Sequence, residues 1–268
     1  MKTKTNFSGI FLIGFLLAMF FLPQTVGAET SARHKNGVLI NDNGTIYLLQ
    51  NDTRRGFATA EEFLSHGYVF AMVVPANAED MKLPQGDNLK ARSGTLVLDT
   101  ADNKTVYLML DDGAHPFPNI EQLIFYVRPE SREIYSINLS TYPKAGQIGF
   151  DFYYFPRPAG ILVDLDGTVY LITPSGKSPF SSQEMFFSYG YDYRMVVQGN
   201  DGDRRKAVLP VQKYRDGTLV DDKGTVFLIS EGEKFGFKTW QAYLAAGYGP
   251  GITTVGDTAG YPEGESFE

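Results

Sequence analysis

The 268-residue sequence predicts a β-rich α+β protein built from four tandem repeats of about 60 residues. A Gly/Lys-Thr-Ile/Val-Tyr/Phe-Leu segment recurs with its aromatic residue at steps of 60, 63 and 57 positions, at Tyr47, Tyr107, Tyr170 and Phe227. A second aromatic residue follows each of these ten positions later, at Phe57, Phe117, Phe180 and Phe237. A fixed register inside so long a period indicates one copied supersecondary unit, with insertions between the copies.

The copies divide the chain into a leader and four repeats. We assign residues 1–28 to a signal peptide and residues 29–91, 92–156, 157–214 and 215–268 to repeats 1 to 4. Repeat 2 is the divergent copy, because Val127-Arg128 stands where the others carry Gly67-Tyr68, Gly190-Tyr191 and Gly247-Tyr248. It also ends in an aromatic tail.

Each repeat is predicted to begin with a β-hairpin. In repeat 3, residues 161–163 and 168–172 are apolar segments around the turn Asp164-Leu165-Asp166-Gly167, and residues 218–220 and 225–229 repeat this pattern in repeat 4. A glycine with Asp or Asn beside it suits the positive φ that such turns require.

A short helix and a final strand are predicted to complete each repeat. Helix-capping residues occupy one equivalent position in all four copies, Thr59, Asn119, Ser182 and Thr239. Large apolar residues on the buried face follow at Phe63, Leu123, Phe186 and Tyr243. Glycine then ends the helix as a left-handed C-cap at Gly67, Gly190 and Gly247. The final strand is expected over Ala71 to Val74 in repeat 1 and Arg194 to Gln198 in repeat 3.

The joints between the repeats are short, as at 156–158 and 213–215. They favour one pseudo-symmetric assembly of packed repeats. A propeller-like ring and four separate beads are the alternatives.

The N-terminus has the layout of a secretory signal. Lys2 and Lys4 precede an apolar run from Ile10 to Leu22, and small residues lead to a cleavage position after Ala28. A membrane span needs about 20 apolar residues, so a retained anchor is the weaker alternative. The sequence therefore predicts a secreted or cell-surface protein without a transmembrane anchor.

Charge and cysteine content narrow the class of partner. Removing Lys2 and Lys4 with the leader leaves 22 basic against 31 acidic residues, a formal charge of −9, so nucleic acid is not expected as a partner. The chain has no cysteine, which excludes disulfides, a thiolate nucleophile and a soft metal site. Stability is expected to come from packing within and between the repeats.

Recurrent acidic residues are the strongest catalytic candidates. Glu61, Glu121 and Glu184 recur in register, and a pair of carboxylates could hydrolyse a glycosidic bond. The first turn of a helix also favours acids through the helix dipole, and Gln241 takes the fourth equivalent position. We favour the structural interpretation and predict no catalytic residue.

Metal and cofactor sites are not predicted either. The turns that end at Gly44, Gly167 and Gly224 resemble the opening of a calcium loop but lack its later Glu, and the loop at 200–203 is a weaker candidate. The three histidines, His34, His66 and His115, share no close spacing and are expected at the surface or in loops.

An aromatic cluster supplies the candidate binding site, at Phe150, Phe152, Tyr153, Tyr154 and Phe155. In a strand these residues alternate between two faces, so one face could stack on a sugar or a partner. Burial of both faces between repeats is the favoured alternative.

The repeat pattern itself carries one resemblance. Repeat 3, with Gly-Thr-Val-Tyr-Leu-Ile, then Pro-Phe-Ser-Ser-Gln-Glu-Met-Phe and Gly-Tyr, resembles an uncharacterised tandem repeat of exported bacterial surface proteins. The resemblance implies a secreted or surface location and a repeat scaffold, with no catalytic residue to carry over. Repeat 2 departs from it at Gly-Tyr.

Three functional hypotheses follow. The first is a non-enzymatic secreted protein that binds cell-wall glycan or a surface protein partner. The second is a structural spacer or assembly subunit of the cell envelope, for which self-association would be diagnostic. The third is a hydrolase with an unrecognised carboxylate site.

Overall fold

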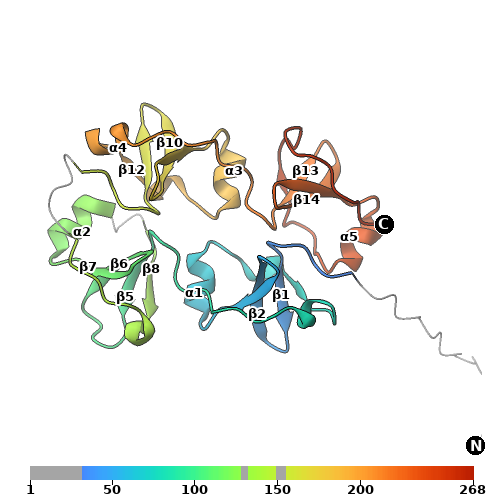
Figure 1. Cartoon of the computed structure of the whole chain (residues 1–268), viewed down its shortest axis with the longest axis horizontal. Coiled ribbons are helices and arrows are strands. Elements are labelled where there is room, and N and C mark those ends of the chain that lie inside the picture. Colours follow the sequence, from blue (N-terminus) through green and yellow to red (C-terminus); the bar gives the residue numbers. More distant parts are fainter. Residues whose placement is uncertain (1–31, 128–131, 149–154) are drawn as a thin grey trace, which may run out of the picture. The chain divides into compact units, whose positions relative to one another are not determined.

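The computed structural model describes residues 32–127, 132–148 and 155–268 (Figure 1). The predicted signal peptide, residues 1–28, lies outside them. Within the described residues no helix is long and apolar enough to cross a membrane. The predicted fold class is confirmed, since four similar four-stranded mixed sheets are accompanied by a few short helices. We call the part of the structure that each repeat forms a unit.

Each unit contains a meander of three antiparallel strands, and a fourth strand pairs in parallel with the first. Unit 1 has the order β3-β2-β1-β4, from β1 (Leu39–Asp42), β2 (Thr45–Gln50), β3 (Thr53–Gly56) and β4 (Val73–Pro75). Unit 2 has the order β7-β6-β5-β8, from β5 (Leu96–Asp99), β6 (Val106–Leu110), β7 (Gly113–Pro116) and β8 (Ile134–Ile137). Unit 3 has the order β11-β10-β9-β12, from β9 (Leu162–Leu165), β10 (Thr168–Ile172), β11 (Lys177–Pro179) and β12 (Val196–Gln198). Unit 4 has the order β15-β14-β13-β16, from β13 (Leu219–Asp222), β14 (Thr225–Ser230), β15 (Glu233–Gly236) and β16 (Thr254–Val255).

The predicted hairpins are present with the expected turn chemistry. In unit 1, Asp42 pairs with Thr45, so Asn43 and Gly44 form a two-residue turn with φ of 49° and 92°. The Asn41 side chain closes it by accepting a hydrogen bond from the Gly44 amide at 2.8 Å. Positive φ at both turn positions is the geometry that matches the twist of the two strands.

The third strand of each meander was not predicted. The segments concerned, such as Thr53-Arg54-Arg55-Gly56 in β3, are short and show no apolar alternation. Each is stabilised by pairing with its neighbour, as β3 is with β2, and this pairing is a tertiary effect that the local sequence does not encode.

The helices follow the meanders as predicted. They are α1 (Ala60–Ser65), α2 (Ile120–Val127), α3 (Gln183–Ser188) and α5 (Trp240–Ala245). All four predicted cap residues accept a backbone hydrogen bond three residues on, at Thr59, Asn119, Ser182 and Thr239. The predicted buried residues are buried too, with Phe63, Phe186 and Tyr243 each 1% exposed.

The final strands are shorter than predicted. In units 1 and 3 the 3₁₀ turns η1 (Phe70–Met72) and η5 (Tyr193–Met195) take up the first residues expected in β4 and β12. The Asp192 side chain favours this turn, because it accepts a hydrogen bond from the Arg194 amide at 2.8 Å. Three further short elements follow the final strands, η2 (Asp80–Lys82), η4 (Leu139–Thr141) and α4 (Asp201–Arg205).

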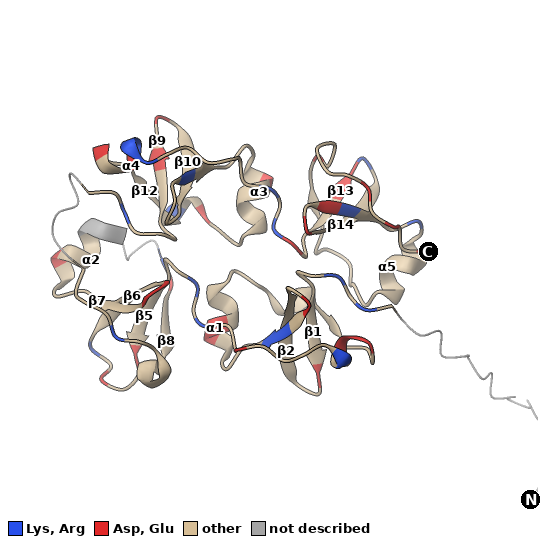
Figure 2. Ribbon diagram, viewed as in Figure 1, with Lys and Arg blue, Asp and Glu red and all other residues tan. Residues whose placement is uncertain are grey.

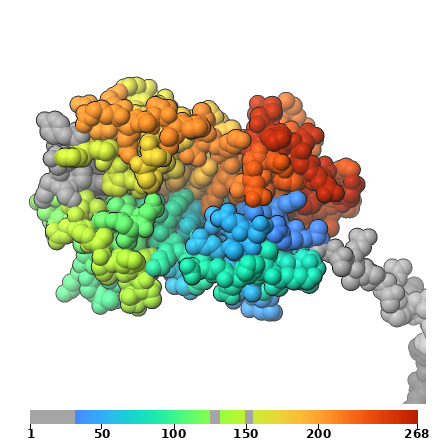
Figure 3. Space-filling view, viewed as in Figure 1, coloured from blue at the N-terminus to red at the C-terminus, as the bar shows by residue number. Residues whose placement is uncertain are grey.

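Hydrophobic cores are shared between units. One core combines Ile40 and Val74 of unit 1 with Leu228, Phe235 and Tyr243 of unit 4. A second core combines unit 2 with unit 3. In the space-filling view unit 1 (blue) accordingly touches unit 4 (red), and unit 2 (green) touches unit 3 (yellow) (Figure 3). Separate beads are therefore excluded, since a unit taken alone would expose one face of its sheet.

Contacts between units follow an internal two-fold relation, not a four-fold one. Gly94 of unit 2 approaches Gly160 of unit 3, and Gly217 of unit 4 approaches Gly37 of unit 1 in the same way. These two pairs are related by a shift of 123 positions, from 94 to 217 and from 37 to 160. The same shift relates Gly67 to Gly190, which meet each other. Units 1 and 2 thus form one half, and units 3 and 4 form the other.

Candidate functional site

Most of the predicted aromatic site, Phe150 to Tyr154, lies outside the described residues, so the stacking surface there stays a prediction. Phe155 is described, and its side chain is 62% exposed. Its carbonyl accepts a hydrogen bond from the Asn200 side chain at 3.0 Å, which ties this segment to the start of α4.

Another set of aromatic rings is exposed on units 1, 3 and 4. Phe70 is 56% exposed and Tyr193 is 52% exposed, and each stacks on the buried helix phenylalanine of its unit with ring centroids 4.9 Å apart. In unit 4, Trp240 is 51% exposed and stacks on Tyr243 at 4.7 Å. Each of these rings therefore stacks on the core while about half of its residue's surface stays exposed.

The exposed rings belong to two kinds of secondary-structure element. Phe70 and Tyr193 lie in the 3₁₀ turns η1 and η5, whereas Trp240 is the first residue of α5. In unit 2, Ile120 takes the position of Trp240 and is 61% exposed. An exposed ring thus occurs in units 1, 3 and 4, and an exposed aliphatic side chain, Ile120, in unit 2.

The recurrent acids lie where helix capping requires them. Glu61 and Glu121 are in the first turns of α1 and α2. The pKa of Glu184 in α3 is lowered by its own backbone amide and then by Gln183 and Ser182. A buried acid that the repeat pattern did not single out, Glu62, accepts hydrogen bonds from the Thr59 amide and, at 2.5 Å, from the Tyr142 hydroxyl. Its role is to join α1 to unit 2.

The carboxylates of the acidic turns likewise accept hydrogen bonds from backbone amides. Asp164 accepts from the Gly167 amide at 2.7 Å, and Asp221 accepts from the Gly224 amide at 2.8 Å. The 200–203 loop begins α4, where Asn200 and Asp203 form a reciprocal capping box. Over the described ranges, no three His, Asp or Glu side chains are grouped so as to hold a metal ion.

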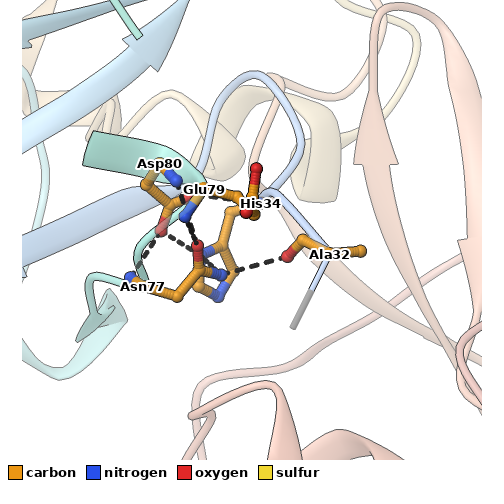
Figure 4. Close-up of polar contacts among 5 residues, drawn as sticks. All are labelled: Ala32, His34, Asn77, Glu79 and Asp80. Atoms are coloured by element: carbon orange, nitrogen blue, oxygen red, sulfur yellow. Dashed lines mark hydrogen bonds and ion pairs between the residues drawn. The ribbon is translucent and has the colours of Figure 1, made fainter. Parts of the chain in front are cut away.

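His34 is hydrogen-bonded to the buried carboxylate of Asp80. Its Nδ1 lies 2.7 Å from an Asp80 carboxylate oxygen, and Asn77 donates to the same carboxylate (Figure 4). Burial alone would raise the pKa of Asp80, but the bonds from His34 and Asn77 hold it below its ordinary value. The equivalent pair in the second half joins Arg157 to Asp203. In each half, this pair ties the first residues to the segment that follows the final strand of the first unit, β4 in unit 1 and β12 in unit 3.

The other two histidines differ in their surroundings. His115 lies in β7 and not in a loop, and its ring bonds to Asp112 and to the Gly146 carbonyl. His66 is the half-buried turn residue that ends α1, which fits the loop position expected of it. Its Nε2 lies 2.7 Å from the Lys90 carbonyl oxygen, and burial lowers its pKa to about 4.

Two arginines meet the ends of α1 and α3. Arg92 donates to the His66 and Tyr189 carbonyls at 3.3 and 2.6 Å, and Arg215 donates to the His66 carbonyl at 2.7 Å. Both lie on the basic connections that enter units 2 and 4, coloured blue beside α1 and α3 (Figure 2). A cation at a helix C-terminus is favoured by the helix dipole and satisfies carbonyls that the helix leaves free.

Each of these arginines also covers a tyrosine ring. The guanidinium carbon of Arg92 is 4.4 Å from the centroid of Tyr191, and that of Arg215 is 3.5 Å from the centroid of Tyr68. The two tyrosines are the Gly-Tyr residues of units 1 and 3. Their recurrence is therefore explained by a cation–π contact between units as well as by burial.

Two equivalent junctions lie beside these arginines. We call the first the open junction; it is a hollow of about 360 Å³ between units 1, 2 and 3, lined by Gly94, Arg92, Arg132, Gly160, Gly190 and Met195. We call the second the closed junction; it joins units 3, 4 and 1 around Gly37, Met72, Ser188, Gly217, Tyr248 and Ile252. Cavities of about 20 and 50 Å³ lie there, and a separate hollow of about 560 Å³ borders Gly37, Tyr68 and Arg215. The two junctions thus differ in the residues that surround their cavities.

Comparisons with known proteins leave the function open. No family model matches the sequence. No curated protein matches it either. Among solved structures, the chain is similar to a protein of the periplasmic assembly from the ESX-5 inner membrane complex, with 13% identity and a TM-score of 0.20, covering 88% of this chain and 67% of that one. A chain of an intact ESX-5 inner membrane complex is similar with 14% identity and a TM-score of 0.20, and this chain, 88% covered, spans 58% of its length. Likeness at this level supports no inference.

The sequence held one unused signal of the central contacts. Lys90-Ala91-Arg92-Ser93-Gly94-Thr95-Leu96 and Lys213-Tyr214-Arg215-Asp216-Gly217-Thr218-Leu219 share four residue types in addition to the arginine, at a shift of 123 positions. That pattern distinguishes units 2 and 4 from units 1 and 3. It would have indicated a duplication of pairs.

Proposed function

We propose that the chain is a non-enzymatic, extracytoplasmic repeat protein that binds cell-wall glycan through the exposed rings of units 1, 3 and 4. The observation that carries this proposal is the recurrence of Phe70, Tyr193 and Trp240, each about half exposed and each stacked on a buried aromatic ring. A ring held on one face by the core is a rigid platform that loses little conformational entropy on binding. Sugar rings present C–H faces that pack on such platforms.

Repetition favours a polymer as the ligand. Three weak contacts on one rigid scaffold bind a repeating chain far more tightly than any one of them, provided that the chain spans the sites. The exported location rests on the predicted leader at residues 1–28 and on the resemblance to exported surface repeats. The non-enzymatic assignment rests on Glu61, Glu121 and Glu184, whose positions in first helical turns account for their recurrence.

The test is co-sedimentation of the full chain with purified peptidoglycan sacculi. The variant is the triple substitution F70A/Y193A/W240A, and its matched control is V208A/V211A/V255A, which removes three apolar side chains that are 64%, 49% and 75% exposed. At about 1 kcal/mol for each ring, the aromatic triple variant should bind at least tenfold more weakly, and the control should bind like the parent.

Three results would contradict the proposal. They are failure of the parent chain to sediment with sacculi, equal loss in both triple variants, and release of sugar fragments during the incubation. Binding that survives only towards an isolated surface protein would favour a protein partner. Concentration-dependent self-association without glycan binding would favour the assembly subunit.

A further inference from the structure

The open and closed junctions share one backbone frame, so their side chains can be compared position by position. Val97 pairs with Tyr135 in unit 2, and the equivalent Val220 pairs with Thr254 in unit 4. Counting back along each strand, Arg132 and Glu133 of the open junction correspond to Gly251 and Ile252 of the closed one. By the shift of 123 positions, Arg194 corresponds to Ala71.

The open junction thus has cations, Arg132 and Arg194, where the closed junction has the small residues Gly251 and Ala71, and it has the acid Glu133 in place of the apolar Ile252. Ile252 packs against the core shared by units 1 and 4, and together with Met72 and Tyr248 it fills the closed junction. In the open junction the described residues surround a hollow with Arg132 and Arg194 at its wall. Apolar side chains stabilise a contact between units without the desolvation penalty of buried charges, so stability does not explain the arginines.

Arg132 is the most informative side chain of the hollow. It is half-buried and donates through one terminal nitrogen to the Gly94 carbonyl at 3.2 Å and through the other to the Met195 carbonyl. Its Nε atom is buried and, among the described residues, has no hydrogen-bond partner. A buried donor left without a partner costs about 1–3 kcal/mol, more when it is charged.

Arg92 and Arg132 differ from Arg194, which forms an ion pair with Asp192. In the described part of the chain no carboxylate lies within ion-pair distance of Arg92 or Arg132. Burial, and then repulsion from Arg92, lowers the pKa of Arg132 to about 10, so it stays protonated at neutral pH. The acids at the hollow do not relieve this. Asp192 is engaged by Arg194 through contacts of 2.7 to 3.0 Å, and Glu133 is exposed.

We infer that the open junction is a binding site for an oxyanion, a phosphate or a carboxylate group, held by Arg132 with Arg92 behind it and Arg194 at the mouth. A guanidinium fork pairs with two oxygens of such a group, and Arg is better suited to this than Lys. The hollow of about 360 Å³ is large enough for the oxyanion and part of the molecule that carries it. This site is independent of the exposed rings and would stand if glycan binding failed.

The experiment is isothermal titration calorimetry of the full chain with inorganic phosphate and, separately, with acetate. We expect saturable binding with one site per chain for at least one of the two, and the tighter probe identifies the class of the natural ligand. Arg132→Gln should weaken this binding at least tenfold, and Arg194→Gln should weaken it severalfold. Arg33→Gln is the matched control, because Arg33 pairs with Asp52 away from the hollow, and it should leave the affinity unchanged.

A second measurement uses the unsubstituted chain, so it does not require a substituted protein to fold. The Nε–H resonance of Arg132 in the parent chain should shift in step with the calorimetric saturation, whereas that of Arg33 should not. Absence of saturable binding for both probes, an unchanged affinity in Arg132→Gln, or a stationary Arg132 resonance would overturn the inference.

Discussion

The open junction and the closed junction are the same joint made twice with different contents. Both are framed by a glycine pair, Gly94 with Gly160 and Gly37 with Gly217, and both lie beside an arginine that meets a helix end. The closed junction is lined by Ile252, Met72 and Tyr248 around small cavities, and the open junction has Arg132 and Arg194 around a larger hollow.

This difference indicates how the two halves have divided their roles. The closed junction is stabilised by apolar contacts, and the same contacts would have been available to the open junction. The open junction has charged side chains in place of that apolar contact, and the buried Nε of Arg132 has no hydrogen-bond partner among the described residues. Such a loss is expected where binding, and not packing, has determined the residues.

The largest effect is expected where the halves are identical, at the central contact of Gly67 with Gly190. A Cβ atom at Gly67 would lie 2.6 Å from the Gly190 Cα, and φ is +72° at this position. Gly67→Ala should therefore lower the free energy of unfolding by about 3 kcal/mol or more, as measured by urea denaturation. Gly190→Ala should cost a similar amount.

Gly44→Ala is the control for this substitution. Gly44 also has a positive φ, +92°, but no atom lies within 4 Å of the added Cβ. It should cost only the backbone strain, about 1 kcal/mol. Equal losses for Gly67→Ala and Gly44→Ala would show that the close approach of the halves contributes nothing.

The next largest effect distinguishes the two junctions directly. Ile252→Glu places in the closed junction the residue that the open one carries at Glu133. Because Ile252 is half-buried against the shared core, the change should cost about 2 kcal/mol. The reciprocal Glu133→Ile, at an exposed position, should change stability by less than about 0.5 kcal/mol. Equal costs in chemical denaturation would mean that the two junctions pack alike.

The smallest effect concerns a position at which the halves differ, because unit 1 has His66 where unit 3 has Tyr189. The pKa of His66 is about 4 in the folded chain and 6.5 in the unfolded one, so between these values the unfolded chain binds more protons. Stability should therefore fall as the pH is lowered from 7 to 5, by about 1 kcal/mol for a half-buried ring. Urea midpoints at both pH values measure it.

His66→Tyr copies the residue of the second half and should remove this pH dependence. The carboxyl of Asp80, whose pKa is lowered from 3.8, contributes stability that is lost only at more acidic pH and should not interfere. A decline between pH 7 and 5 that persists in His66→Tyr would assign it to other groups.

Much of the unit could be predicted from the sequence. The capping residues, the turn glycines and the buried helix aromatics, such as Thr59, Gly44 and Phe63, were all predicted correctly. Each acts through neighbours within a few residues, so the local pattern carries the information. The third strands, such as β3, could not be predicted because their pairing partner decides their conformation.

The candidate sites were less predictable. Phe70 and Tyr193 share one position in their units and Trp240 has another, and only the fold shows that each rests on a buried ring. The expected surface or loop position of His115 was wrong for a related reason, since pairing with β6 orders the segment as β7.

The sequence by itself determined the copied unit, its turns and its caps, because these depend on backbone geometry over a few residues. Only the tertiary structure decided that four copies associate as two pairs, that Gly67 meets Gly190, and that one joint is closed while its twin holds Arg92 and Arg132 around a hollow. These features depend on which surfaces of distant units exclude water together. That is a property of the packed chain, and no single repeat contains it.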